Sequence, residues 1–300
     1  MIVEQVWTGN AYRNFNYLIA CGETGEALAI DPLDFKKCLA VARNKGWTIT
    51  QILNTHEHGD HTGGNKGLMQ ATDAKLIAHK NAKNRIANVD VGVGAGDVIK
   101  VGNSVELECL DTPGHTMCHI CLLSHTDDPG LFSGDTLFNA GAGNCHNGGH
   151  PAELYETFET QLDKLDDNTR IYPGHDYLLN NLGFTLDREP DNDTARQMLE
   201  DFANQDPEDA LVTTMAQERE INTFFRLSNP TIVEKLIEEF PELGDSPDER
   251  AVFLKLRELR NSWKSGERQG SLAIYRSFRD AMPSTGNIAR GTGAAVRQAG

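Results

Sequence analysis

The sequence predicts an α+β protein in which a four-layer α/β/β/α sandwich precedes a smaller helical domain. Strand-like segments alternate with a few helical ones over about the first 175 residues, which fits two sheets packed face to face with helices outside. After His175 the segments favour helix almost throughout,. We therefore expect domains at residues 1–180 and 181–282, followed by a flexible tail at 283–300 that is rich in Gly, Ala, Ser and Thr,.

The elements of the first domain are predicted from short apolar runs bounded by turn residues. Strands are predicted near residues 2–3, 16–20, 27–31, 50–53, 75–79, 98–99, 105–110, 119–123, 131–132 and, as the last one, 170–172. Helices are predicted over 35–45, near 64–71 and over 151–165. The first three strands read as a meander, because only short turns separate them.

The second domain is predicted from helical periodicity. Helices are expected at 193–204, 216–221, 231–240, 249–264 and 271–282. In the segment 249–264, Val252, Leu256, Leu259 and Trp263 fall on one stripe at helical spacing,. Ser246 is predicted to cap this helix, with acidic residues in the first turn,.

Composition and charge exclude several classes of function. The net charge is −16 and no basic stripe is evident, which argues against nucleic-acid binding and against attraction to anionic membranes. No apolar run approaches the roughly 18 residues of a membrane span. Without an N-terminal basic and apolar leader we expect no signal peptide, a cytoplasmic location and free thiols at the six cysteines,.

The densest chemical signal lies at residues 55–61, which read Thr-His-Glu-His-Gly-Asp-His. A predicted strand precedes this motif and a turn follows, so it occupies a loop at a strand end, where α/β proteins usually place their chemistry. In an extended chain His56, His58 and Asp60 would share one side, and the turn would then bring in His61. One tetrahedral ion usually takes fewer ligands from such a loop, which suggests two metal ions.

Further ligand candidates follow other predicted strand ends. His115 comes after Thr-Pro-Gly, Asp135 after Ser-Gly, and His175 after Tyr-Pro-Gly. A glycine before each ligand lets the backbone turn sharply and leaves room for an ion. These three residues, added to the loop at 55–61, complete a set large enough for two ions.

These motifs, in this order, resemble the metallo-β-lactamase superfamily. The resemblance implies a two-metal site with His56, His58 and His115 on one ion, Asp60, His61 and His175 on the other, and Asp135 bridging them. The catalytic groups would then be Asp60 and Asp135 with a metal-bridging hydroxide. The nitrogen-only first site suits zinc, and the mixed second site could also hold iron or manganese.

Within that superfamily the chain resembles the glyoxalase II family of hydroxyacylglutathione hydrolases. The resemblance is carried by residues 174–182, 189–192 and 218–226, and it extends over about residues 2–264. It implies hydrolysis of S-(2-hydroxyacyl)glutathione to glutathione and a 2-hydroxy acid, as in methylglyoxal detoxification. A glutathione thioester would be the small-molecule partner.

The loop at 141–150 departs from that family. Asn144 and His146 stand where the family has a basic and an aromatic residue that hold glutathione, and a lysine soon after Arg226 is absent. Tyr177 and Arg226 still match, and Arg226 could pair with a substrate carboxylate. We therefore take Tyr177, Arg226, Asn144 and His146 as candidate substrate contacts.

Other residues and other functions remain open at this point. Glu57 is expected to point away from the metals, and His79, His119 and His125 are expected to be structural. The alternative functions are a persulfide dioxygenase with one iron, a hydrolase of another ester or thioester, and a metal-binding protein without turnover. The acyl group, the metal and the oligomeric state do not follow from the sequence.

Overall fold

The computed structural model describes residues 1–264, which form two six-stranded sheets and a set of helices. The first sheet has the order β1-β2-β3-β4-β5-β6, and the second has the order β14-β13-β10-β9-β8-β7. The first sheet comprises β1 Ile2–Trp7, β2 Phe15–Ala20, β3 Glu26–Ile30, β4 Thr48–Asn54, β5 Lys75–His79 and β6 Val91–Val93. The second comprises β7 Val98–Val101, β8 Val105–Asp111, β9 Ile120–Ser124, β10 Gly130–Gly134, β13 Arg170–Pro173 and β14 Thr213–Thr214. A small hairpin, β11 Leu137–Phe138 and β12 Gly141–Ala142, forms a separate two-stranded sheet.

Strand direction brings several carboxyl ends together. β1, β2 and β3 form the predicted antiparallel meander, whereas β3 to β6 run parallel. In the second sheet β10 and β13 are parallel neighbours, so the residues that follow them leave the sheet at the same edge. Long loops therefore gather there, as sites do in open parallel sheets.

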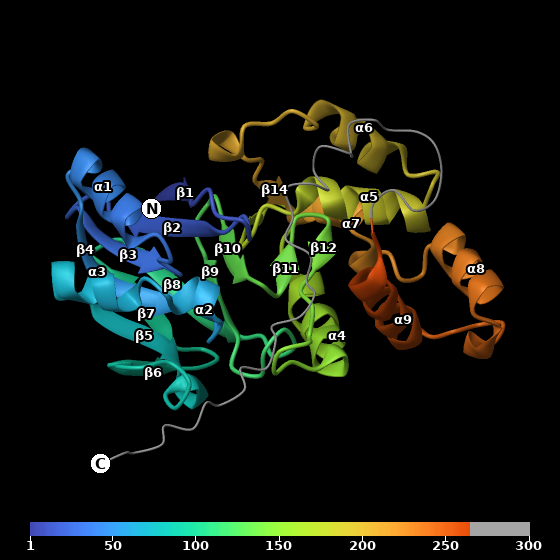
Figure 1. Cartoon of the computed structure of the whole chain (residues 1–300), viewed down its shortest axis with the longest axis horizontal. Helices are drawn as coiled ribbons and strands as arrows, with labels where there is room; N and C mark the ends of the chain where they lie inside the picture. The colour runs from blue at the N-terminus through green and yellow to red at the C-terminus, as the bar shows by residue number, and fades with distance from the viewer. Residues whose placement is uncertain (265–300) are drawn as a thin grey trace, which may run out of the picture.

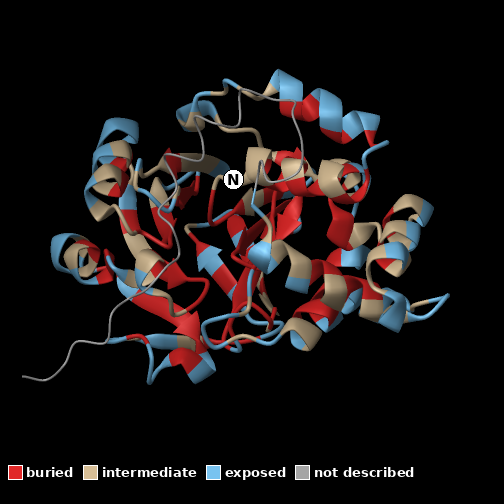
Figure 2. Cartoon of the chain, turned by 45° about the vertical axis from the view of Figure 1, so that its right-hand side comes forward, coloured by how far each residue is buried: buried red, intermediate tan, exposed pale blue. Residues whose placement is uncertain are grey.

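The four predicted layers are present (Figure 1). α1 Phe35–Lys45 and α3 Asn65–Thr72 cover the outer face of the first sheet, where their apolar side chains pack on β2 to β5. The facing sides of the two sheets share one buried core. The outer face of the second sheet packs against α4 Pro151–Thr160 and the helices of the C-terminal part. Figure 2 shows this burial: the strands are mostly buried, and exposed residues lie on the outer faces of the helices.

The C-terminal part comprises α5 Leu178–Arg188, α6 Asp193–Asp201, α7 Met215–Ile221, α8 Pro230–Glu239 and α9 Glu249–Ser262. In α9, Val252 and Leu256 of the predicted stripe are fully buried, together with Phe253. The residue that caps α9 is Asp248, which accepts from the Ala251 N–H at 2.8 Å, and not Ser246 as predicted.

Most predicted elements are confirmed, and the differences have local causes. Residues 170–172 are not the last strand, because the two-residue strand β14 adds to the edge beside β13. The helix predicted over 151–165 ends at Thr160, and a short 3-10 turn follows at Leu162–Lys164. Sequence reasoning missed α5, and the expected domain boundary at 180 falls inside it. The helix predicted at 271–282 and the tail at 283–300 lie outside the described residues.

Two smaller predictions can also be compared with the structure. All six cysteines fall within residues 1–264, and each is a free thiol. No helix in that range is both long enough and apolar enough to cross a membrane.

The contact between the two parts of the chain includes a fully buried glutamate, Glu218 of α7. Its carboxylate accepts hydrogen bonds from Thr213, from Asn222 and from the backbone of Ala140, which lies in the turn between β11 and β12. Burial raises the pKa of Glu218 to about 7. A buried carboxyl group of this kind makes stability depend on pH.

The substitution Glu218→Gln should therefore flatten the pH dependence of stability. Because the folded-state pKa lies above the ordinary value of 4.5, the stabilisation is complete below the unfolded-state pKa and is lost as the pH rises through the folded-state pKa. Between about pH 5 and about pH 8, the metal-free wild-type protein should lose on the order of 2 kcal/mol more unfolding free energy than the variant. Urea unfolding at several pH values measures this, and equal slopes would contradict it.

Candidate metal centre

The predicted ligands lie on loops that leave the ends of neighbouring strands. The loop after β4 carries His56 and His58, and the short helical turn α2 Gly59–Thr62 carries Asp60 and His61. The loop between β8 and β9 carries His115, β10 leads directly to Asp135, and β13 leads through Gly174 to His175. The structure brings all seven predicted side chains into one cluster.

Three imidazoles form one half of this cluster. His58 Nδ1 lies 3.0 Å from His56 Nε2 and 3.0 Å from His115 Nε2. Three nitrogens this close in an imidazole-only group make a site that could hold a divalent ion,.

Asp60, His61 and His175 form the other half. The two imidazole Nε2 atoms lie 3.2 Å apart, and Asp60 Oδ2 lies 3.6 Å from that of His61 and 3.5 Å from that of His175. The helical turn α2 is the reason for this grouping. An extended chain would place Asp60 on the same side as His56 and His58. The turn ends the extended segment at His58, so Asp60 lies on a different side from these two histidines.

Asp135 lies between the two halves. Its Oδ1 is 3.4 Å from His61 Nε2, and its Oδ2 is 3.2 Å from His175 Nε2 and 3.5 Å from His115 Nε2. The carboxylate therefore contacts imidazoles of both groups, in the position that a bridging ligand would need.

Each imidazole of the cluster is oriented by its second ring nitrogen. His115 Nδ1 donates to Asn144 O at 2.6 Å, His175 Nδ1 to Tyr12 O at 2.7 Å, and His58 Nε2 to Asn147 O at 3.0 Å. These carbonyl acceptors fix the tautomer, so the nitrogen that faces the cluster is the unprotonated one.

His61 and His56 are oriented through Asp31 and Thr55. His61 Nδ1 donates to Asp31 Oδ2 at 2.9 Å, and the same carboxylate accepts from the Thr55 hydroxyl at 2.6 Å. Because that hydroxyl directs its proton to Asp31, it accepts from His56 Nδ1 at 3.0 Å,. Asp31 follows β3 and precedes Thr55 by 24 residues, which is why the motif alone does not reveal it.

Two observations indicate that a cation fits the cluster. Asp135 Oδ1 is buried and has no hydrogen-bond partner within residues 1–264, although such an atom normally finds one,. A Cβ added at Gly174 would lie only 2.3 Å from that oxygen and 2.9 Å from His61 Cε1. The glycine thus leaves space beside an unsatisfied anion among imidazole nitrogens.

The electrostatics of the cluster are those of a ligand set. Burial lowers the pKa of His115 to about 4 and that of His56 well below its usual value, so both imidazoles are neutral. Burial opposes ionisation of Asp135, but His175 and His61 outweigh it and hold the pKa of that carboxyl well below its usual range. Burial also opposes the charged form of His61, yet Asp135 and Asp31 raise its pKa well above the usual value. A cation beside His61 would displace that proton, so its affinity should fall at low pH.

His119, which is predicted to be structural, packs against two residues of the cluster, Asp135 and His56. The Asp135 N–H donates to His119 Nε2 at 3.1 Å, and the His119 ring stacks on that of His56 at 5.1 Å between centroids. Glu57 points away from the cluster, as predicted, because it accepts hydrogen bonds from Arg85 and from the Thr116 hydroxyl.

Three of the four candidate substrate contacts lie beside the cluster. The Tyr177 ring stacks on His175 with centroids 4.9 Å apart, and its hydroxyl donates to Tyr12 O at 3.1 Å. Asn144 and His146 have exposed side chains on the divergent loop, where the Asn144 carbonyl already orients His115. Their contact with a substrate stays a prediction.

Arg226 has a different environment. Its Nε donates to Glu189 Oε2 at 2.7 Å, its Nη2 donates to the other oxygen of the same carboxylate, and its Nη1 donates to Arg219 O at 3.1 Å. This bidentate pair with a buried glutamate occupies the guanidinium,. We therefore do not propose Arg226 as a substrate contact.

Sequence reasoning missed two arginines of α9 that approach the cluster. Arg257 donates to the carbonyls of Ala142 and Gly143, at 2.6 Å and 3.1 Å, directly before Asn144. Burial lowers the pKa of Arg257 to about 9, and no carboxylate of residues 1–264 pairs with it. Arg260, one turn further on, donates to Asn181 at 3.0 Å and helps to lower the pKa of Tyr177, which burial raises. Their spacing of three residues on one helix face is the signal that could have found them.

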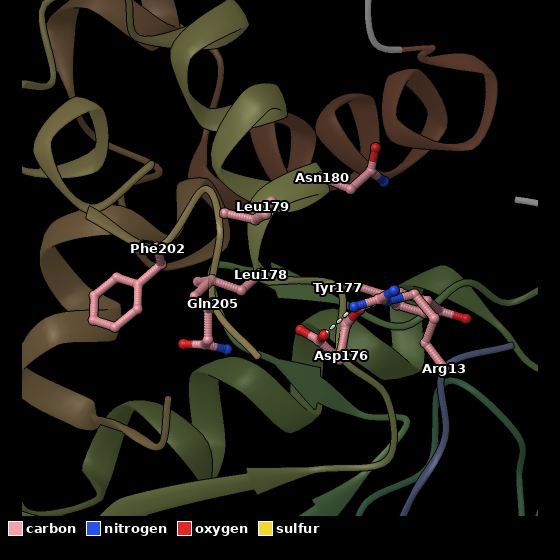
Figure 3. Close-up of a pocket in the computed structure, with 8 residues that line it drawn as sticks. All are labelled: Arg13, Asp176, Tyr177, Leu178, Leu179, Asn180, Phe202 and Gln205. Atoms are coloured by element: carbon pink, nitrogen blue, oxygen red, sulfur yellow. Dashed lines mark hydrogen bonds and ion pairs between the residues drawn. The ribbon is translucent and has the colours of Figure 1, made fainter. Parts of the chain in front are cut away.

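A separate pocket lies beside Tyr177 (Figure 3). It is lined by Arg13, Asp176, Tyr177, Leu178, Leu179, Asn180, Phe202 and Gln205. Arg13 and Asp176 form an ion pair on one side of it. None of the seven side chains of the cluster lines this pocket, so we do not assign it to the chemistry.

The substitution Asp31→Asn should weaken metal binding at the half that contains His61. The amide removes the charge that holds the His61 Nδ1 proton, and losing such an orienting partner typically lowers metal affinity by about 10- to 100-fold. Competition with a chromophoric chelator measures the affinity. Asp90→Asn is the matched control, since Asp90 accepts from the Leu76 N–H far from the cluster, and equal affinities in the two variants would contradict the role of Asp31.

Comparison with known proteins agrees with the geometry. Residues 13–175 match the family described as the metallo-beta-lactamase superfamily, and residues 176–263 match the hydroxyacylglutathione hydrolase C-terminus. Among solved structures, ETHE1 from Myxococcus xanthus superposes with a TM-score of 0.60 at 26% identity and covers 87% of this chain and 98% of its own. A metallo-beta-lactamase from Staphylococcus aureus subsp. aureus COL gives a TM-score of 0.59 at 27% identity, covering 87% of this chain and 71% of its own.

The sequence relatives narrow the family. Hydroxyacylglutathione hydrolase from Polaromonas sp. (strain JS666 / ATCC BAA-500) is 68% identical, over 88% of this chain and 100% of the relative. The hydroxyacylglutathione hydrolase of Nitrosococcus oceani is 64% identical over the same shares. The chain therefore belongs to the hydroxyacylglutathione hydrolase family of the metallo-beta-lactamase superfamily.

Proposed function

We propose that this protein is a metal-dependent thioester hydrolase that converts S-(2-hydroxyacyl)glutathione to glutathione and a 2-hydroxy acid. The observation that carries the proposal is the cluster of five imidazoles and two carboxylates, in which each imidazole has its outer nitrogen held by an acceptor. The hydroxyacylglutathione hydrolase relatives supply the substrate class.

The residues of the cluster would hold two divalent ions. His56, His58 and His115 would bind one through nitrogen, which suits zinc, and Asp60, His61 and His175 would bind the other, which suits zinc, iron or manganese,. Asp135 would bridge them. When bound, such a pair polarises a carbonyl group and lowers the pKa of water so that it attacks at neutral pH.

The surrounding side chains account for the choice of a thioester. A thiolate leaves readily, since the pKa of a thiol is about 8.5, so the site needs no dedicated proton donor for the leaving group. With metal bound and the His61 proton displaced, the centre would offer none on its inner side, because its imidazoles would present unprotonated nitrogens and Asp135 is ionised,. Tyr177 stays protonated, because burial raises the pKa of its phenol.

Arg260 would supply a cation for an anionic thiol carrier, and the buried Arg257, whose guanidinium is bonded within the protein, would add to the positive field only. The chain as a whole has a net charge of −16, so a glutathione conjugate approaches against the overall field unless local cations attract it. Both arginines lie on α9. Arg257 donates to the two carbonyls directly before Asn144, and Arg260 donates to Asn181 of α5, the helix that follows Tyr177. Arg260 takes the place that sequence reasoning gave to Arg226.

The persulfide dioxygenase alternative is not favoured. The second half of the cluster, with Asp60, His61 and His175, is complete, and the C-terminal part matches the hydroxyacylglutathione hydrolase C-terminus. The divergent loop is the observation that favours considering a different thiol carrier, because its Asn144 and His146 are exposed.

The protein should hydrolyse S-lactoylglutathione and lose that activity when a chelator removes its metal. Asp135→Asn should lower kcat by at least about 100-fold, because even an orienting partner of a ligand is worth about 10- to 100-fold. Thiol release and metal content per chain are the measurements, with Asp128→Asn as the control, since Asp128 pairs with Arg170 at the surface.

Two results would overturn the proposal. One is a protein with two bound ions that leaves the thioester intact. The other is a protein with one iron per chain that consumes oxygen in the presence of glutathione persulfide, which would favour the dioxygenase.

Arg260→Ala should raise KM for S-lactoylglutathione with little change in kcat. A hydrogen bond to a charged group is worth about 1.5–3 kcal/mol, so kcat/KM should fall by about 10- to 100-fold. Arg250→Ala on the same helix is the control, because Arg250 is half-exposed and lies 4.0 Å from Glu156. Both variants should hydrolyse an uncharged acyl thioester of N-acetylcysteamine equally well. If Arg260→Ala loses as much activity with that substrate as with S-lactoylglutathione, the assignment of Arg260 is wrong.

A further inference from the structure

Glu218 of the helical part contacts the hairpin that follows Asp135 of the metal centre. Its carboxylate is fully buried. Oε1 accepts from the Thr213 hydroxyl at 2.6 Å, and Oε2 accepts from the Ala140 N–H and from Asn222 Nδ2, both at 2.9 Å. No Lys or Arg of residues 1–264 pairs with it. Burying a carboxylate without a counter-ion costs free energy, so the three hydrogen-bond donors must stabilise it. Its structural role therefore follows from the segments that carry these donors.

Ala140 belongs to the turn of the β11–β12 hairpin, and the other two donors also bond to that turn: Thr213 accepts from Asn139, and Asn222 donates to Gly141 O. Ala140 lies at the tip with φ +57°, in the left-handed region that a non-glycine residue rarely adopts,. Its N–H finds its acceptor in Glu218. The remaining polar groups of the turn also pair with side chains of the helical part: Asn139 O accepts from Asn181 at 2.9 Å, and Gly141 O accepts from Asn222 at 3.2 Å.

The hairpin connects the parts of the metal centre. Its first strand begins two residues after Asp135, and Phe138 packs edge-on against the His175 ring with centroids 5.8 Å apart. Beyond its second strand, the Gly143 N–H donates to Thr136 O at 3.1 Å. The next carbonyls, of Asn144 and Asn147, accept from His115 and His58.

The fit of this loop against Asp135 leaves little freedom. A Cβ added at Gly143 would lie 1.8 Å from Asp135 O and 3.2 Å from His115 Nδ1. A shift of the hairpin tip would therefore be transmitted to Asp135 at one end and to the two histidine acceptors at the other, because close-packed segments move together.

We propose that Glu218 is a positioning residue which, from the helical part, clamps the β11–β12 hairpin and so sets the geometry of Asp135, His115 and His58. The segment 218–226, which resembles a substrate segment in sequence, thereby has a different role, in which Glu218 and Asn222 hold the hairpin and Arg226 pairs with Glu189. The inference rests on the proposed function only where kcat is the readout.

The first test compares Glu218→Ala with the conservative variant Glu218→Gln. The alanine variant should lower metal affinity, measured by chelator competition, by about 10-fold or more, as other lost outer partners do. It should also change the visible absorption spectrum of the cobalt-loaded protein and speed hydrogen exchange at the Ala140 amide. Glutamine keeps an oxygen for that N–H, and the Thr213 hydroxyl can turn to accept, so this variant should restore affinity to within about threefold.

A second pair of variants keeps the test valid if Glu218→Ala does not fold. Thr213 and Thr185 are both fully buried. The Thr213 hydroxyl donates to Glu218 at 2.6 Å and accepts from Asn139 of the hairpin turn at 2.7 Å, whereas the Thr185 hydroxyl donates to Ile221 O at 2.7 Å. Thr213→Val should weaken metal binding by about threefold or more, whereas Thr185→Val should lose thermal stability without changing metal affinity.

The outcomes separate this inference from the proposed function. Metal affinity, cobalt spectrum and amide exchange are measured without substrate, so they test the clamp even if S-lactoylglutathione is not hydrolysed. Unchanged metal affinity and unchanged Ala140 exchange in Glu218→Ala, or equal metal affinities in the two threonine variants, would overturn the clamp.

Discussion

Five imidazoles and two carboxylates in one buried cluster can act together as metal ligands only if the remaining ring protons of the imidazoles point outward. The structure meets this constraint with an acceptor for every ring: three backbone carbonyls, the Asp31 carboxylate and the Thr55 hydroxyl. Once a cation displaces the His61 proton, every nitrogen that faces the inside can offer a lone pair to an ion beside Asp135. The inner oxygen of Asp135 has no hydrogen-bond partner in residues 1–264. The fold around the cluster can be understood as the means of placing those acceptors.

The acceptors come from loops of the first sheet and from the loop beyond the hairpin, while His115, Asp135 and His175 follow strands of the second sheet. Tyr12 and Asp31 follow strands of the first sheet, while Asn144 and Asn147 lie beyond the β11–β12 hairpin. The two sheets must therefore pack in one register for both halves of the cluster to be oriented at once. The shared apolar core between the sheets enforces that register, because its close packing resists sliding,.

The helical part adds to this arrangement in two ways. It places Arg257 against the carbonyls of Ala142 and Gly143, and it buries Glu218 beneath the Asn139–Ala140 turn. Both contacts fall on the hairpin that follows Asp135. The helical part is thus bound to the loop that orients the first half of the cluster.

Local patterns could predict much of the chain. The meander, α1 and the parallel strands around β4 appear where apolar runs and turn residues place them. By contrast, α5 was missed, because its two asparagines and one glycine are weak helix formers,. Burial of Leu182 and Phe184 against neighbouring elements decides its structure. The two-residue strand β14 has no pattern of its own and exists only because β13 offers it an edge.

The sequence by itself determined the ligand types and their order, because histidines and aspartates after glycine-marked strand ends are local features that no packing can change. The tertiary structure shows which of these side chains lie together in each half of the cluster, since the turn α2 separates Asp60 from His56 and His58. It alone also revealed Asp31, Glu218 and the pairing of Arg226 with Glu189. The physical reason is that a hydrogen-bond partner or a counter-charge is chosen by distance in space, and residues far apart along the chain become neighbours only after the sheets and helices have packed.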